Sequence, residues 1–399
     1  MLHGMQVLDF GRMAAAPYAA MLLADLGADV IKVEPLAGDE CRALGPPFVS
    51  DDGAQFLTLN RGKRSLALDL RSPAARALVE RLVMRSDIVI HNFRADAAQA
   101  MGIDYDTLRG LRENLVYCAI SGFGIDGPWK SRPGVDLIFQ AFTGMMAVTG
   151  RPDDPPLRPG VPVADLSTAL SSVIGILGAI VHRLRTGEGQ KVDVAAIDAL
   201  MAVQSSVFAF TFATGENPPR LGNASPFAIS NALPTADGAI ALTVTSDKFW
   251  RRLATALNLE TELLRPEFDS NTGRLAASET IYAILSARLR NGTTSHWLNV
   301  LGSADVPCGP VQTFREALDH AQTHSNGTVV EHLHGSGRRV SSIAAPMKFG
   351  RGPIPASRAA PLLGEHSVEV LSELGCTHNE INELLAQGIV VAAPAAHAN

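Results

Sequence analysis

The chain has 399 residues, of which 46% are apolar and 19% charged, so it can bury a sizeable core and is not a disordered protein. Its length allows two domains. The formal net charge of −6 at pH 7 excludes a nucleic-acid-binding protein that relies on bulk positive charge, but leaves room for a small basic pocket for one phosphorylated ligand.

Short apolar runs alternate with helix-like segments from the N-terminus up to a linker at 215–220, which contains Asn217-Pro218-Pro219. The predicted strands are Gln6–Phe10, Asp29–Val33, Ser65–Leu70, Asp87–Ile90, Leu115–Ile120 and Gln190–Val194. The predicted helices are Ala15–Leu26, Pro73–Met84 with Ser72 as N-cap, Asp104–Arg112, Asp165–Arg185 and Ala195–Ala213. Such alternation is typical of a parallel sheet with helices on both faces, so we expect an α/β fold.

Beyond the linker the pattern changes, and 225–330 is predicted to be a second, smaller α+β domain. It contains one predicted strand and four predicted helices: Ala239–Thr243, then Lys248–Leu257, Ser278–Leu289, Thr294–Leu301 and Phe314–Ala321. Loops are expected at 335–339 and 350–355, two helical segments within 364–385, and a loose tail over 391–399.

Nothing in the sequence predicts secretion or a membrane span. The N-terminus lacks a charged region followed by an apolar one, and the apolar run Leu166–Val181 is about 16 residues long, where a span needs roughly 20. We expect a buried helix there. The 4 cysteines are scattered without a CxxC pair, which favours a reducing, cytoplasmic setting.

Asp165 is the strongest local signal for chemistry, because it precedes a long and nearly uncharged helix. As an N-cap its carboxylate would accept the free N–H groups of the first turn. The same position lies at the positive end of the helix dipole, which would keep the carboxylate ionised beside apolar neighbours. A poorly solvated, ionised carboxylate is a usable nucleophile.

Positive charge follows two of the predicted strands. Arg71 and Arg94 come after the third and fourth strands, at the edge of a parallel sheet where ligands bind. A phosphorylated ligand suits that placement, although each arginine taken singly also fits a solvated loop. The first strand–helix turn, Gly11–Ala16, is not a GxGxxG fingerprint, and no phosphate loop, GxSxG, HExxH or metal-spaced Cys/His cluster is present. We therefore expect no metal.

Motifs along the whole chain make the sequence resemble the class III CoA-transferases, the family of formyl-CoA transferase, carnitine CoA-transferase and α-methylacyl-CoA racemase. Their order and spacing carry the resemblance. They are VLDFGRMAAAPYAAMLLADLGADVIKVEP at 7–35, NRGKRSLALDL at 60–70, IVIHNFR at 88–94, ISGFGIDGPWKSRPGVDLIFQAFTGMMAVTG at 120–150, HRLRTGEGQKVDVAAIDA at 182–199, PTADGAIAL at 234–242, PCGPV at 307–311 and PLLGEHSVEVLSELG at 361–375.

The resemblance implies a Rossmann-like large domain built from 1–214 and 340–399, with a small domain at 225–330, in an interlocked homodimer. It implies acyl-CoA and carboxylic acid substrates, with coenzyme A as the transferred group and neither nucleic acid nor membrane as partner. Asp165 falls at the family's nucleophile. Contacts with CoA are implied for Leu68, Asp69, Leu70, Arg71, Asn92, Phe93, Arg94, Met101 and Asp136.

Two departures from the relatives narrow the expected reaction. Val135 stands where the racemases carry a catalytic histidine, which disfavours racemisation. Gly222–Pro226 lacks the glycine run of formyl-CoA transferases, which argues against oxalate as acceptor. We expect CoA transfer from a dicarboxylyl-CoA such as succinyl-CoA to itaconate, mesaconate, citramalate or glutarate. The alternatives are a racemase of the same family, an NAD-type oxidoreductase and a non-catalytic CoA-binding protein.

Overall fold

The computed structural model describes residues 1–350 and 358–393. Its contacts divide the chain into two compact units. Unit 1 comprises 1–144, 159–209 and the segment from His324 onward, and unit 2 comprises 145–158 and 210–323. Residues 145–158, which the sequence analysis assigned to the large domain, group with unit 2 in this division. The predicted loops and tail lie partly outside the described residues, at 351–355 and 394–399.

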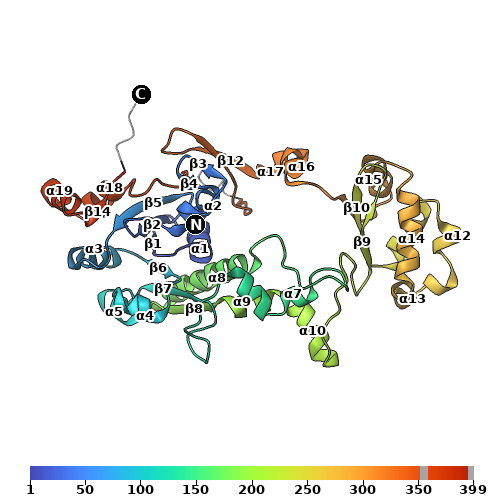
Figure 1. The fold of residues 1–399 in the computed structure, drawn as a ribbon, viewed down its shortest axis with the longest axis horizontal. Helices are drawn as coiled ribbons and strands as arrows, with labels where there is room; N and C mark the ends of the chain where they lie inside the picture. The colour runs from blue at the N-terminus through green and yellow to red at the C-terminus, as the bar shows by residue number, and fades with distance from the viewer. Residues whose placement is uncertain (351–357, 394–399) are drawn as a thin grey trace. The chain divides into compact units, whose positions relative to one another are not determined.

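A seven-stranded sheet forms the centre of unit 1 (Figure 1). Its strands lie in the order β14-β5-β2-β1-β6-β7-β8, all parallel except β14, which runs antiparallel to β5. Without β14 this is the order of the doubly wound dinucleotide-binding sheet, and it reverses at β1. The α/β prediction is confirmed. The bounds are β1 Gln6–Asp9, β2 Asp29–Glu34, β5 Lys63–Leu68, β6 Ile88–His91, β7 Val116–Ser121, β8 Lys191–Ala195 and β14 Val390–Val391.

Helices cover both faces of this sheet because successive strand residues point to opposite sides. Leu8 packs with the helices of one face and Val7 with those of the other. The first face holds α3 Pro73–Val83, α4 Ala95–Ala100, α5 Tyr105–Leu111, α18 Ser367–Glu373 and α19 His378–Ala386, and the second holds α1 Ala15–Asp25 and α8 Val163–Thr186.

Other elements of unit 1 are short. They are η1 Glu40–Ala43, β3 Phe48–Val49, β4 Asp52–Gly53, α2 Ala54–Leu59, α6 Asp136–Phe142, α9 Ala196–Val203, β12 Val329–Leu333 and β13 Arg339–Ile343. The prediction of a single helix over 195–213 is wrong. The chain bends by 77° between α9 and α10 Ser205–Thr214, with neither glycine nor proline at the break to indicate it.

Unit 2 is built on an antiparallel sheet of three strands in the order β11-β10-β9. Trp250, Leu253, Ile281, Leu285 and Trp297 form the centre of its core. Only β10 was predicted from the sequence. The elements are α7 Met145–Val148, β9 Ile229–Pro234, β10 Ala239–Val244, α11 Asp247–Ala256, α12 Glu260–Leu263, η2 Pro266–Phe268, α13 Asn271–Ala276, α14 Ser278–Leu289, α15 Thr294–Ser303, β11 Cys308–Pro310 and α16 Phe314–Asp319, with α17 Ala321–Asn326 at the boundary.

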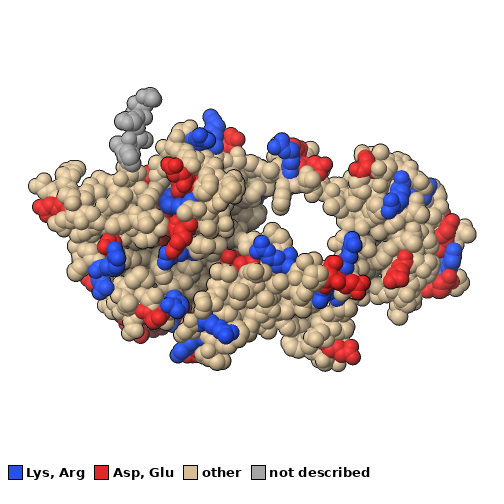
Figure 2. Space-filling model, in the orientation of Figure 1, with Lys and Arg blue, Asp and Glu red and all other residues tan. Residues whose placement is uncertain are grey.

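Helix α8 is longer than the sequence suggested. Its 24 residues are apolar enough to cross a membrane by length and composition alone, and half of its most apolar stretch is buried inside the fold. Part of its other side is apolar and exposed, with Ile174 71% and Leu184 73% exposed. The face drawn in Figure 2 carries charged groups of both signs scattered over mostly uncharged surface.

Candidate active site

A cavity of about 360 Å³ opens at the carboxyl edge of the unit 1 sheet, where the strand order reverses. Its walls are the end of β2 and the segments that follow β1, β5 and β6. Ligands of open α/β sheets bind in this position. Three cations and three carboxylates are among the lining residues, namely Arg12, Lys32, Arg71, Glu34, Asp39 and Asp69.

Six residues that the resemblance assigned to CoA line this cavity: Leu68, Asp69, Leu70, Arg71, Phe93 and Met101. The Arg71 guanidinium is largely exposed and donates to both carboxylate oxygens of Asp69, at 2.8 and 3.2 Å. This pairing raises the pKa of Arg71 and lowers that of Asp69. Asp69 thus orients a cation at the cavity wall. That these residues bind CoA stays a prediction.

Asn92 and Arg94 flank Phe93 but are not part of the lining. The Asn92 Oδ1 accepts the backbone N–H of Arg12 at 2.9 Å, and its Nδ2 donates to the Arg12 carbonyl at 2.8 Å. Asn92 therefore holds the turn that forms one wall. The Arg94 guanidinium lies 3.7 Å from the Asp96 carboxylate. Direct contact of either residue with CoA remains untested.

Asp165 lies in the first turn of α8, which begins at Val163. The N-cap prediction was wrong, because Pro162 occupies that position and no described residue donates a hydrogen bond to the Asp165 carboxylate. Burial raises the pKa of Asp165 to about 6, and the charge of Asp136 adds to the rise. At pH 7 the carboxylate is still ionised in a ratio of about ten to one.

The acceptor that caps α8 comes from Asp136, at the start of α6. Its Oδ1 accepts the backbone N–H of Ala164 at 2.9 Å and that of Asp165 at 3.4 Å. Its Oδ2 accepts from the Gln140 side-chain amide at 2.6 Å, and the whole group is buried. Asp136 therefore fixes the backbone of Asp165 and places a second negative charge near it. Its predicted contact with CoA is not tested.

Sequence reasoning missed two buried lysines, of which Lys32 lines the cavity. Lys32 and Lys63 have no exposed surface, and both lie on central strands. The signal was available at Lys32, because a lysine inside the apolar run DVIKV must be buried once that strand lies within a sheet covered on both faces. Among residues 1–350 and 358–393, no three His, Cys, Asp or Glu side chains are grouped so as to hold a metal ion.

The fold and the site define an α/β protein with a ligand cavity at the switch point of its sheet and a half-buried carboxylate at a helix start. Residues 2–367 match the family described as CoA-transferase family III. The chain belongs to this family, which makes it a CoA-transferase, as the resemblance implied.

Named relatives agree with this assignment. The chain is 39% identical over 381 residues to the succinate–glutarate CoA-transferase of Agrobacterium fabrum, with 94% of this chain and 95% of that protein covered. It is 37% identical to the succinyl-CoA:mesaconate CoA-transferase of Haloarcula marismortui, with 94% and 96% covered. A crystal structure of a CaiB/BaiF family protein from Brucella suis matches with a TM-score of 0.85 at 35% identity, covering 94% of this chain and 99% of that one.

Proposed function

We propose that this CoA-transferase exchanges CoA between two dicarboxylates, with succinyl-CoA as donor and glutarate as preferred acceptor, and that Asp165 is its nucleophile. The relatives whose names combine succinate with glutarate or mesaconate support the substrate class. The observation that carries the proposal is the Asp165 carboxylate, which is half-buried and has a pKa of about 6. Desolvation of this kind makes a carboxylate a stronger nucleophile than one in water.

The reaction balances without a general acid or base. The Asp165 carboxylate attacks the thioester carbonyl of succinyl-CoA, and the C–S bond breaks to give a mixed anhydride and CoA thiolate. The thiolate attacks the aspartyl carbonyl, which releases succinate and leaves an aspartyl–CoA thioester. The glutarate carboxylate then displaces the thiolate to form a second anhydride. Attack of the thiolate on the glutaryl carbonyl gives glutaryl-CoA and restores the Asp165 carboxylate.

The cavity beside β1 suits the nucleotide end of CoA. It lies at the ligand-binding edge of the sheet and carries cations for the phosphates of an anionic cofactor. The pantetheine arm separates these phosphates from the thioester, so the nucleotide cavity and Asp165 need not share a wall. We therefore place the adenosine phosphates of CoA near Arg71.

Replacing Arg71 by alanine should weaken the binding of CoA esters about tenfold to a hundredfold, because the variant loses a charge-assisted contact to a phosphate. The measurement is the dissociation constant of succinyl-CoA by isothermal titration calorimetry. Arg109→Ala, an exposed arginine on α5 away from the cavity lining, is the matched control. Succinyl-pantetheine, which lacks the adenosine phosphates, should bind equally well to both variants. An equal loss of affinity for this short ester would show that Arg71 lies near the thioester and not near the adenosine phosphates.

The protein is proposed to be an interlocked homodimer, as the resemblance implies. The exposed apolar side chains of α8 support this, because Leu170, Ile174, Val181 and Leu184 recur at spacings of three, four and seven residues along one helix face. Sedimentation equilibrium of the purified chain should give twice the mass of 42.2 kDa. A monomer mass at micromolar concentration would contradict the dimer.

The deciding experiment for the function is a two-substrate assay with purified protein, succinyl-CoA and a panel of acids. The panel contains glutarate, mesaconate, citramalate, itaconate, oxalate and acetate, and mass spectrometry measures each new CoA ester. We expect glutaryl-CoA to form fastest. No transfer to any acid would refute the proposed substrates. Rapid deuterium uptake at the α-carbon of 2-methylacyl-CoA in D₂O would instead identify a racemase.

A further inference from the structure

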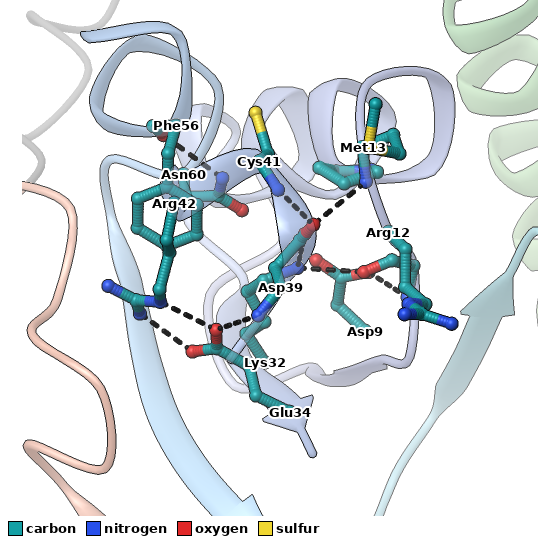
Figure 3. Close-up of polar contacts among 12 residues, drawn as sticks. Asp9, Arg12, Met13, Lys32, Glu34, Asp39, Cys41, Arg42, Phe56 and Asn60 are labelled. Atoms are coloured by element: carbon teal, nitrogen blue, oxygen red, sulfur yellow. Dashed lines mark hydrogen bonds and ion pairs between the residues drawn. The ribbon is translucent and has the colours of Figure 1, made fainter. Parts of the chain in front are cut away.

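The turn between β1 and α1, residues Gly11–Met13, has five backbone polar groups that are bound by side chains. Figure 3 shows Asp9, Lys32 and Asp39 beside this turn, with Asp39 in contact with Met13. The Gly11 N–H donates to Asp9 Oδ1 at 2.7 Å, and the Gly11 carbonyl accepts from Lys32 Nζ at 2.7 Å. Asn92 binds both polar groups of Arg12, as described above. The Met13 N–H donates to Asp39 Oδ1 at 3.0 Å.

Each carboxylate that binds this turn is paired with a buried lysine. Lys32 Nζ lies 2.9 Å from Asp39 Oδ2. Lys63 Nζ donates to Asp9 Oδ2 at 2.7 Å, to Asn60 Oδ1 at 2.7 Å and to the Pro17 carbonyl at 2.8 Å. All three hydrogens of Lys63 thus have acceptors. We call Asp9, Lys32, Asp39 and Lys63 the lysine clamp.

The conformation held by the clamp is one that the chain would not favour by itself. Met13 has a φ of 66°, in the left-handed region that side chains other than glycine rarely adopt. A Cβ at Gly11 would lie 2.5 Å from the Cβ of Ala16 and 2.7 Å from Asp9 Oδ1, so the turn approaches α1 too closely for any other residue. Strained backbone of this kind persists where its surroundings over-determine it, and it clusters at functional sites.

Stability alone does not account for the lysine clamp, because buried ion pairs are often no better for folding than apolar residues of similar volume. Two of the four clamp residues, Lys32 and Asp39, instead line the cavity together with Gly11 and Arg12 of the turn. We propose that the lysine clamp presets the Gly11–Met13 turn as a rigid wall of the CoA cavity, and that Lys32 is a positioning residue for CoA esters. This inference rests on the proposed placement of CoA in that cavity.

The ammonium group of Lys32 acts through the turn. Its side chain has no exposed surface, and it contacts the Gly11 carbonyl and the Asp39 carboxylate. Burial disfavours the charge on Lys32, but Asp9, Asp39 and Glu34 more than compensate and raise its pKa. Lys32 therefore keeps its positive charge throughout the physiological pH range. Burial lowers the pKa of Lys63 to about 8, so Lys63 begins to lose its charge at the upper end of that range.

The test compares Lys32→Met with Arg64→Met. Arg64 is a similarly buried cation that pairs with Asp29, Glu369 and Glu373 and does not touch the turn. In the Lys32 variant we expect the dissociation constant of free CoA to rise at least tenfold and amide exchange at Gly11–Met13 to accelerate at least tenfold. The Arg64 variant should unfold at a lower temperature but bind CoA within twofold of wild type.

A folded Lys32→Met protein with unchanged CoA affinity or unchanged exchange in the turn would overturn the proposal. If that variant does not fold, Asn92→Ala replaces it, because Asn92 is only half-buried and its loss frees both polar groups of Arg12. The same two changes are expected, and their absence overturns the proposal. If wild type does not bind CoA, the placement of CoA fails, and with it the assigned role of Lys32.

Discussion

Asp165→Ala should abolish CoA transfer while leaving the fold intact. Removing a catalytic nucleophile typically slows covalent enzymes by several orders of magnitude, and we expect a loss of at least about a thousandfold in kcat. The variant should still bind CoA, because Asp165 does not line the cavity. Incubating wild type with succinyl-CoA and hydroxylamine should modify Asp165, as detected by peptide mass spectrometry.

The stability of this variant gives an independent check of the geometry. Burial raises the pKa of Asp165 to about 6 in the folded protein. At pH values above the ordinary pKa of an aspartate, the ionised side chain therefore destabilises the folded state relative to the unfolded state. Alanine should therefore raise the melting temperature at pH 7–8, and the gain should shrink as the pH falls toward 4. Asp198→Ala, which removes an exposed carboxylate from the first turn of α9, is the matched control and should retain transfer. Appreciable turnover in Asp165→Ala would remove Asp165 from the mechanism.

Asp136→Ala should be the most damaging substitution that does not touch the nucleophile itself. It leaves the N–H groups of Ala164 and Asp165 and the Gln140 amide without their acceptor, and each unpaired buried group costs about 1–3 kcal/mol. We expect a lower melting temperature together with a loss of about tenfold or more in kcat, because small displacements of a reacting group are costly. Thermal unfolding and steady-state kinetics measure the two effects.

Asp136→Asn separates the charge of Asp136 from its hydrogen bonds. The amide oxygen can still accept from Ala164, and the buried Gln140 Oε1, which has no partner in wild type, can accept from the new NH₂ group once the Gln140 amide flips. The loss of the charge should lower the pKa of Asp165. In wild type kcat/KM should rise with pH through about 6, and in the Asn variant this rise should shift to lower pH. An unshifted profile would show that Asp136 does not influence the charge of Asp165.

Sequence patterns predicted the six parallel strands of the large unit 1 sheet because each is a short apolar run between turn signals. They did not predict the short strands β3, β4, β12, β13 and β14, and the expected loose tail at 391–399 begins inside β14. They failed for β9, whose sequence ISNALP mixes polar and apolar residues, and for β11, which is only three residues long. They also failed at the bend between α9 and α10. Elements of this kind depend on tertiary packing rather than on local propensity.

Some residues of the candidate site could likewise be predicted from the sequence, and others could not. Asp165 and Arg71 were found because they begin or follow recognisable elements, whereas Leu68, Asp69 and Leu70 came from the resemblance to the family. The capping of α8 by Asp136 could not be read from the sequence, since the two groups are 29 residues apart and meet only after folding. The lysine clamp was missed for a similar reason, because the burial of Lys63 depends on strands paired far along the chain.

The antiparallel strand β14 has a consequence for biosynthesis. Val390 and Val391 pair with Leu68 and Ala67, so this end of the β5 edge gains its partner strand only when the ribosome has added about 320 further residues. At the 5–20 residues per second of protein synthesis, that edge stays without its partner strand for roughly 16–65 s. An uncovered strand edge is a template for pairing with other chains. The nascent polypeptide therefore spends most of its synthesis with this part of the β5 edge unpaired.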